Sequence, residues 1–351
     1  MRWAVIVAVV AAVVAWPAAP ALARASDAQE VCRITDPAVV EASGLAALPG
    51  GGYIVENDSN PEPRKMRVFY LGPDCSVTRS VGYPTTARDP EDLAVDSSGV
   101  VWVADIGDNS PLTGGSGKRR DTIALWTLQP GAKTMKIHRL RYPDGVPRDA
   151  EALLVDGAGR PVIVTKDPSG EVYRLDTPLP TDNAAGAPLT LVGHFTPSHS
   201  GTDNPFGFFG SALITGGAVS PDGTRAVLRT YSDAYEFDVT RGDVAAAITT
   251  GTPRVTPLPG EPQGEAIAYT PDGTGLLTVS DQPGPVSILR YRITKPATSA
   301  PAPSSRAPSP SPVAAGEVTD RRARVALLTG AFVVVAVGLV AGVARRARRR
   351  R

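Results

Sequence analysis

Hydrophobic residues in this chain fall in short runs separated by turn-forming glycine, proline, serine and aspartate. Residues 89–109 show this arrangement clearly. An apolar run at residues 93–96 is followed by a Ser-Ser-Gly turn and a second run at residues 100–104. Runs of this length, bounded by turn signals, predict two β-strands joined in a hairpin. Acidic residues flank the hairpin, with Glu91 at its start and Asp105 at its end.

The same pattern returns along the chain, so residues 89–109 are one copy of a repeat. Copies begin at residues 41, 91, 151, 218 and 265, a spacing of roughly 50–65 residues that is near the span of one four-stranded blade. A third strand, rich in aromatic and β-branched residues, follows each hairpin, and a more polar fourth strand follows in most copies. The sequence therefore predicts an all-β fold, a β-propeller with five blades. A sixth, degenerate blade within residues 179–211 is the alternative.

The two ends of the chain predict export and a membrane anchor. Residues 1–23 resemble a secretory signal peptide, and an N-terminal transmembrane anchor is less favoured because the apolar run is short. Residues 26–294 then form the ectodomain, followed by a stalk rich in proline, alanine and serine at residues 295–319. Residues 325–344 form an apolar run of about 20 residues, long enough to cross a bilayer once as a helix. The arginine-rich tail at residues 345–351 predicts a cytoplasmic C-terminus and an extracellular ectodomain.

The last repeat lacks a fourth strand because the sequence becomes proline-rich after Thr294, whereas a spare strand at residues 30–35 precedes the first repeat. We expect this strand to complete the last blade and close the ring, which leaves no exposed edge. Cys32 lies on the closing strand, and Cys75 lies beside the outer strand of the first blade. In an exported domain, two cysteines favour a disulfide over a metal pair or two free thiols, and a bridge here would pin the closure.

The near-neutral charge of the whole chain conceals an acidic ectodomain. Of the 36 lysines and arginines, Arg2 and Arg24 precede the ectodomain and nine flank the apolar run, which leaves 25 against 35 acids. A net charge of about −10 argues against nucleic acid as a partner and favours cations or basic ligands.

Acidic and amide residues recur at the ends of the predicted strands. In a propeller blade the inner strand begins at the rim where the second strand ends, so both sets of residues surround one mouth of the central channel. The fourth repeat departs from the pattern, with Gly216 and Gly217 where glutamate is expected. The mouth residues are Glu41, Glu91, Glu151 and Glu265, with Asn57, Asp58, Asp105, Asp108, Asn109, Lys166, Arg229, Ser280 and Asp281.

Carboxylates that converge on one mouth repel one another, so they must be protonated, paired or bound to a metal. Oxygen ligands suit a hard cation, and Ca²⁺ is the first choice. The alternative is a structural ring in which the glutamates pair with lysine and arginine; no catalytic residue is assigned. The expected metal ligands are Glu41, Asn57, Glu91, Asp105, Glu151 and Glu265, and the expected ligand-binding residues are Lys166, Arg229 and Asp281.

The longest insertion, at residues 194–215, joins the third blade to the fourth and emerges at the acidic mouth. It carries Phe206, Phe208 and Phe209 among glycines. We expect these side chains to pack down between blades. The alternative is a flexible lid over the mouth or a surface that stacks on a ligand.

Several phrases in the chain look like those of an exported, membrane-anchored β-propeller group of actinobacteria. They include Pro-Glu-Asp-Leu-Ala from residue 90, Asp-Ile-Gly-Asp-Asn from residue 105 and Gln-Gly-Glu-Ala-Ile from residue 263, and the resemblance extends over residues 30–294.

More distantly, the repeat resembles calcium-dependent gluconolactonase-type propellers and phytase-like propellers, in which acidic and amide side chains at the mouth hold divalent cations. The matching positions here are Glu41, Asn57, Glu91, Asp105 and Glu151. Lys166 and Arg229 depart from that pattern, and they imply either a replacement for metal charge or a site for an anionic substrate.

These observations predict a membrane-tethered binding or interaction module at the cell surface, whose acidic mouth binds a divalent cation. Its partner is an unidentified extracellular small molecule or protein. The alternative is an enzyme, a metal-dependent extracellular hydrolase of a lactone or phosphoester. The absence of histidine and cysteine from the repeats' mouth positions favours binding over catalysis.

Overall fold

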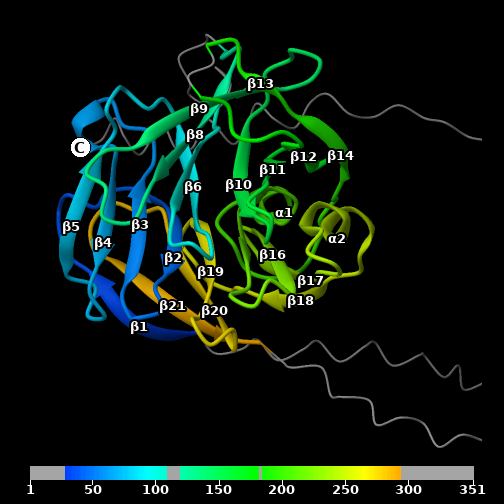
Figure 1. The fold of residues 1–351 in the computed structure, drawn as a ribbon. Coiled ribbons are helices and arrows are strands. Elements are labelled where there is room, and N and C mark those ends of the chain that lie inside the picture. Colours follow the sequence, from blue (N-terminus) through cyan, green and yellow to red (C-terminus); the bar gives the residue numbers. More distant parts are fainter. Residues whose placement is uncertain (1–27, 109–118, 182–183, 294–351) are drawn as a thin grey trace, which may run out of the picture.

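A computed structural model describes residues 28–108, 119–181 and 184–293 as a five-bladed β-propeller (Figure 1). Each blade has four antiparallel strands, in chain order except in the fifth blade, and the inner strands of neighbouring blades pack against one another around the ring. The predicted fold class is confirmed. The predicted signal peptide, stalk, transmembrane helix and basic tail lie outside the described residues. Among the residues that are described, no helix is both long enough and apolar enough to cross a membrane.

The first blade comprises β2 (Ala42–Ala47), β3 (Tyr53–Asn57), β4 (Arg67–Leu71) and β5 (Val77–Gly82). The second comprises β6 (Pro90–Val95), β7 (Val101–Asp105), β8 (Ile123–Leu128) and β9 (Lys136–Arg141). The third comprises β10 (Ala150–Val155), β11 (Pro161–Thr165), β12 (Glu171–Arg174) and β14 (Thr190–His194). The fourth comprises β15 (Ile214–Val219), β16 (Arg225–Thr230), β17 (Asp233–Asp238) and β18 (Arg254–Pro257). The fifth comprises β19 (Gly264–Tyr269), β20 (Gly275–Ser280), β21 (Val286–Arg292) and β1 (Gln29–Ile34). The helices are η1 (Pro63–Lys65), α1 (Gly207–Gly210) and α2 (Val244–Thr250).

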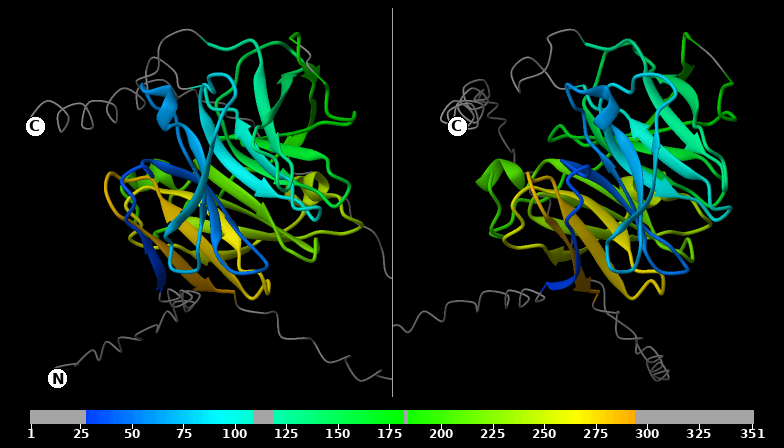
Figure 2. Two further views of the ribbon diagram at one scale, coloured as in Figure 1. Left: turned by 60° about the vertical axis from the view of Figure 1, so that its left-hand side comes forward. Right: turned by 90° about the vertical axis from the view of Figure 1, so that its left-hand side faces the viewer.

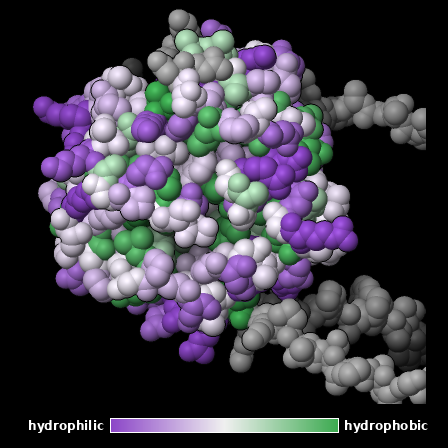
Figure 3. All heavy atoms as spheres, viewed as in Figure 1, coloured by the Kyte–Doolittle hydropathy of each residue, from purple (hydrophilic) through white to green (hydrophobic). Residues whose placement is uncertain are grey.

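The central strands are apolar on both faces because each blade is covered by its two neighbours. All residues of β8, β10 and β11 are buried, and nearly all of them are apolar. Continuous apolar runs are typical of strands covered on both faces. The polar surface of the ring is broken only by small separate groups of hydrophobic residues in the view of Figure 3.

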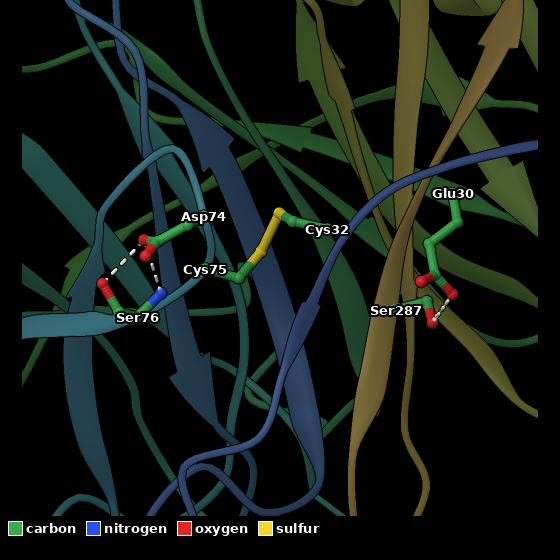
Figure 4. The surroundings of a disulfide bond; sticks show 6 residues. All are labelled: Glu30, Cys32, Asp74, Cys75, Ser76 and Ser287. Atoms are coloured by element: carbon green, nitrogen blue, oxygen red, sulfur yellow. Dashed lines mark hydrogen bonds between the residues drawn. A yellow bond between two sulfur atoms is a disulfide. The ribbon is translucent and has the colours of Figure 1, made fainter.

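The ring closes as predicted. β1 pairs antiparallel with β21, with Ile34 opposite Val286, so the N-terminal strand completes the fifth blade. Cys32 on β1 forms a disulfide with Cys75 in the turn after β4, which ties the fifth blade to the first (Figure 4). In the chain-entropy description, a bridge that spans 43 residues contributes about 3–4 kcal/mol to stability.

The alternative of a sixth blade is wrong. Residues 179–211 instead supply β13 (Ala187–Pro188), which extends the second blade parallel to β9, together with β14 and α1. The expectation for the insertion is also wrong in part. Phe206 is half-buried against Tyr231, but Phe208 and Phe209 are 64% and 47% exposed, because α1 turns them outward instead of between the blades.

The two faces of the ring differ in what they carry. Inner strands begin and second strands end at one face, which we call the mouth. β1 begins and β21 ends at the opposite face, with Gln29 paired to Arg290. Figure 2 shows these two strands, blue and orange, together at the lower edge of the ring.

Candidate metal centre

A β-bulge at the start of the inner strand positions the side chains of the mouth. In four of the blades, one residue of that strand has no partner in the register, and it is Glu91, Glu151, Thr215 or Glu265. An extra residue in a strand re-aims its side chain, which is why bulges recur beside functional sites. The fourth blade therefore has Thr215 at this position, where Gly216 was expected from the sequence.

A second ring of positions follows the second strands. The backbone N–H groups of Asp58, Gly107, Lys166 and Asp281 donate to the carbonyl groups of Glu41, Asp89, Asp149 and Gln263, respectively. These four pairs of residues are thus equivalent in four blades. The second blade is exceptional because its residue is Gly107, which has no side chain at the mouth.

The space beside Gly107 is occupied by carboxylate oxygens. A Cβ atom at Gly107 would lie 1.8 Å from Glu91 Oε1 and 2.7 Å from Asp89 Oδ2. One carboxylate oxygen from each of Asp58, Asp89 and Glu91 lies within 4.8 Å of the others. We call these three residues the Asp58 group. Within the described residues, Glu91 Oε1 is buried and has no hydrogen-bond partner.

A second set of three carboxylates shares Glu91 with the first. One oxygen from each of Glu91, Asp149 and Glu151 again lies within 4.8 Å of the others. Here a cation is already present, because Lys166 Nζ donates to Glu151 Oε1 at 2.6 Å. The backbone N–H of Asp108 donates to Asp149 Oδ1 at 2.8 Å. The Lys166 ammonium thus neutralises part of the negative charge of this set. Lys166 forms its ion pair with Glu151, which is not a member of the Asp58 group.

The protonation of Glu91 follows from its surroundings. Burial raises the pKa of the Glu91 carboxyl well above its usual range, and the neighbouring Asp58, Glu151 and Asp89 raise it further, while Lys166 lowers it. Burial likewise raises the pKa of Glu151, against the lowering effect of Lys166. A bound cation would favour the ionised form of Glu91, so proton and cation compete for the same oxygen.

The far side of the mouth is joined by hydrogen bonds. The Tyr231 hydroxyl donates to Glu265 Oε1 at 3.3 Å, and Gln263 Nε2 donates to the same oxygen at 3.1 Å. Gln263 Nε2 also donates to the Asp281 carboxylate. The Lys166 ammonium lies 5.5 Å from the centre of the Tyr231 ring. These residues form one polar network.

Of the predicted site residues, the structure brings five to the mouth: Glu91, Glu151, Glu265, Lys166 and Asp281. Glu41 lies in the loop before β2 with a left-handed φ of 50°, and it is in neither carboxylate group. The register makes Glu41 equivalent to Asp89 and Asp149, not to Glu91 and Glu151.

Three other predicted residues serve the scaffold instead. Asn57 accepts from Val40 N and donates to the carbonyl groups of Ala38 and Lys65, which holds the loop before β2. Asp105 accepts from two backbone N–H groups and pairs with Arg120. Arg229 is fully buried and pairs with Glu261 at 3.0 Å between the fourth and fifth blades. Asn109 lies outside the described residues.

Asp89 and Asp149 were missed by the sequence analysis, and Asp58 was placed at the mouth without a role. A signal for the first two exists in the sequence, since Asp-Pro-Glu and Asp-Ala-Glu open the inner strands of the second and third blades. The bulge after the aspartate turns both acids of each motif toward the mouth.

Neither protein-family models nor curated proteins gave a match to this chain. Among solved structures, the PQQ-bound aldose sugar dehydrogenase from Streptomyces coelicolor is similar, with 14% identity and a TM-score of 0.40 over 76% of this chain and 98% of that chain. A gluconolactonase from Xanthomonas campestris has 12% identity and a TM-score of 0.40 over 72% of each chain. A streptogramin B lyase has 13% identity and a TM-score of 0.41 over 76% of this chain and 98% of that one. The propeller assignment rests on the sheets described above.

Proposed function

We propose that this protein is a membrane-tethered binding module of the cell surface whose mouth holds one divalent cation in the Asp58 group. The observation that carries the proposal is the convergence of Asp89 and Glu91 oxygens over Gly107, together with the unpaired Glu91 Oε1. A buried carboxylate oxygen without a donor is costly unless it is protonated or bound to a cation. Three carboxylates suit a hard cation, with Ca²⁺ as the first candidate.

The two carboxylate groups are not equivalent candidates. Lys166 already supplies a positive charge to Glu151 at 2.6 Å, and a divalent cation beside it would be repelled. The Asp58 group has Gly107 where the third blade has Lys166, so the second blade places carboxylate oxygens where the third places a cation. We therefore assign the cation to Asp58, Asp89 and Glu91.

The topology of the ring supports the tethered arrangement. The last described strand, β21, ends at the face opposite the mouth, and the chain continues from there toward the predicted stalk and anchor. A propeller attached through that face presents its mouth away from the membrane. The mouth is then open to molecules outside the cell.

The second candidate function is a metal-dependent hydrolase of a lactone or phosphoester, and the position of Lys166 favours it. The Lys166 ammonium lies between Glu151 and the Tyr231 ring, beside a group of acids that shares Glu91. In such an enzyme the cation polarises the substrate, and Lys166 stabilises negative charge that develops on it. Turnover of a lactone and phosphoester panel that is lost in Glu91→Gln would establish this function over simple binding.

Thermal melting of the purified full-length protein in Ca²⁺ and in chelator tests the proposed cation site. A cation bound only by the folded state, at about 100-fold over its Kd, adds about 2.7 kcal/mol to stability. We expect the melting temperature to rise in Ca²⁺ for the parent and for Glu62→Gln, a half-exposed control outside both carboxylate groups, but not for Glu91→Gln. An equal rise in Glu91→Gln, or none in the parent, would contradict the assignment.

A further inference from the structure

The segment between β14 and β15 displays two phenylalanines on the outside of the ring. Phe208 and Phe209 are 64% and 47% exposed, and the other exposed large hydrophobic residues in the described part of the chain are isolated aliphatic side chains. The two rings contact each other edge to face, with centroids 5.7 Å apart. Two adjacent exposed aromatic rings are unfavourable in water and typical of residues that a partner covers.

The segment is held in place from beneath. The buried Asp233 carboxylate accepts from the hydroxyl groups of Ser200 and Thr202, and Asn204 Nδ2 donates to Ser232 Oγ at 2.8 Å. The Tyr235 hydroxyl donates to the Ser198 carbonyl at 2.8 Å. These bonds fasten the segment to the β16–β17 turn, so its aromatic side chains are presented by a fixed support rather than by a loose loop.

The exposed rings are supported as well. The His199 ring stacks on Phe208 with centroids 3.6 Å apart and planes inclined by 18°. His199 Nδ1 lies 2.9 Å from Ser211 Oγ, and Ser211 Oγ donates to the Phe208 carbonyl at 2.8 Å. The orientation of Phe208 is therefore set before any partner arrives, which lowers the entropic cost of binding.

This aromatic surface adjoins the acidic mouth. Phe206, which precedes α1, packs on Tyr231 with ring centroids 4.4 Å apart, and Tyr231 donates to Glu265. Residues 195–213 include one acid, Asp203, and neither lysine nor arginine. Beyond Tyr231 the mouth carries Glu265 and Asp281, and its Lys166 is already paired with Glu151. An apolar surface thus borders the acidic mouth, where Glu265 is buried and Asp281 is half-exposed.

We propose that Phe208, Phe209 and the neighbouring acidic rim form a docking surface for a basic segment of an extracellular protein. The segment would place an aromatic or aliphatic side chain on the phenylalanines and a neighbouring lysine or arginine toward the half-exposed Asp281. Small-molecule sites enclose most of their ligand, whereas these rings stand on an exposed turn, and aromatic anchors beside charges are typical of protein interfaces. This inference supplies a partner class for the binding role proposed above, but it does not require a bound cation.

The probe is a synthetic nonapeptide that alternates lysine with phenylalanine, titrated into the purified full-length protein. Matched peptides carry glutamate in place of lysine, or serine in place of phenylalanine. We expect the lysine–phenylalanine peptide to bind more tightly than either control, in chelator as well as in Ca²⁺. Loss of an anchoring aromatic side chain weakens interfaces by about tenfold or more, so Phe208→Ser and Phe209→Ser should each raise the Kd by at least about tenfold.

Leu191→Ser is the control for loss of an exposed apolar side chain, because Leu191 is 42% exposed on β14 and lies outside the proposed surface. The Kd of Leu191→Ser for the lysine–phenylalanine peptide should match that of the parent. Asp281→Asn should weaken binding of the lysine-containing peptides alone.

Equal binding of lysine and glutamate peptides, or equal Kd values for Phe208→Ser and Leu191→Ser, would overturn the proposal. Phenylalanine-dependent binding to phosphatidylcholine vesicles with no binding of the peptide would overturn it in favour of a lipid surface. Failure of the cation experiment leaves these outcomes unchanged, so the two proposals fail separately.

Discussion

Glu91 and Asp92 are neighbours on β6, and both carboxylates are buried, yet they have opposite surroundings. Asp92 accepts from the backbone N–H groups of Leu93, Leu153 and Gly217, which ties the inner strands of the second, third and fourth blades together. Glu91 Oε1 has no donor and faces other acids instead. A buried acid with three donors holds the ring together, whereas a buried acid without one is a candidate binding group.

The same contrast divides the whole mouth. Asn57, Asp105 and Arg229 satisfy backbone groups or buried charges, and they keep the strand ends in place. The Asp58 group gathers carboxylates around a glycine. Some polar residues at the strand ends thus hold the scaffold, whereas Glu91 presents a buried carboxylate oxygen without a donor among the described residues.

The largest expected effect is that of Asp92→Asn, which alters the structural residue of the pair Glu91 and Asp92. In Asp92→Asn one of the donor N–H groups must face the new side-chain NH₂, which leaves a buried group unpaired. We expect the free energy of unfolding to fall by about 2–4 kcal/mol. Chemical denaturation in chelator measures this change. A stability equal to the parent would mean that Asp92 does not join the blades.

The matching change at Glu91 should leave the apo fold intact. Glu91→Gln removes a buried carboxyl that faces acids, so stability in chelator should stay within about 1 kcal/mol of the parent or rise. The stabilisation by Ca²⁺, about 2.7 kcal/mol at 100-fold over Kd, should disappear. Denaturation curves with and without Ca²⁺ separate the two effects, and a large loss of stability in chelator would place Glu91 with Asp92 as a structural residue.

Gly107→Ala tests the Asp58 group without altering the charge of any side chain. The new Cβ would lie within 1.8 Å of Glu91 Oε1, so the carboxylates must move apart. We expect Ca²⁺ affinity to fall by about tenfold or more, which corresponds to about 1.4 kcal/mol. Gly157→Ala is the matched control, since a Cβ there meets no atom within 4 Å. Equal Ca²⁺ affinity in both variants would show that the space beside Gly107 is not part of the site.

The pH dependence of stability should also depend on Glu91. Its pKa in the folded chain lies above the ordinary value of 4.5, so between these two pKa values the folded state holds a proton that the unfolded chain has released. The stability due to that proton is present at low pH and is lost as pH rises through this window, by at most about 1.4 kcal/mol per pH unit. We expect the parent, in chelator, to lose stability relative to Glu91→Gln as pH rises above 4.5. A difference that stays constant with pH would contradict a raised pKa.

Much of the fold could be predicted because each repeat has a local sequence pattern of short apolar runs and turn residues. Apolar hairpins at regular spacing indicated five blades, the spare strand at residues 30–35 indicated how the ring closes, and Cys32 and Cys75 indicated the disulfide. The sixth-blade alternative arose because residues 179–211 contain apolar runs, whose pairing partners are set by tertiary contacts.

The mouth was harder to predict because a shift of one residue decides which side chains face it. Counting from the strand ends placed Glu41 beside Glu91, but Glu41 precedes the bulge of β2, whereas Glu91 is the bulge residue of β6. Asn57 and Asp105 do end their strands, opposite Ala42 and Pro90, but their side chains bond to neighbouring backbone groups. The pairing of Arg229 with Glu261 was not predicted because Glu261 lies in a connecting segment without a repeat pattern. Asp89 and Asp149 could have been found from the Asp-x-Glu motif.

Calorimetric titration of Ca²⁺ into the chelator-treated full-length protein tests the central claim most directly. Assignment of the cation to the Asp58 group predicts one site, lost in Asp89→Asn and Glu91→Gln and retained in Asp149→Asn. No binding by the parent would contradict a cation site at this mouth. Binding lost in Asp149→Asn and kept in Asp89→Asn would place the cation beside Lys166 instead.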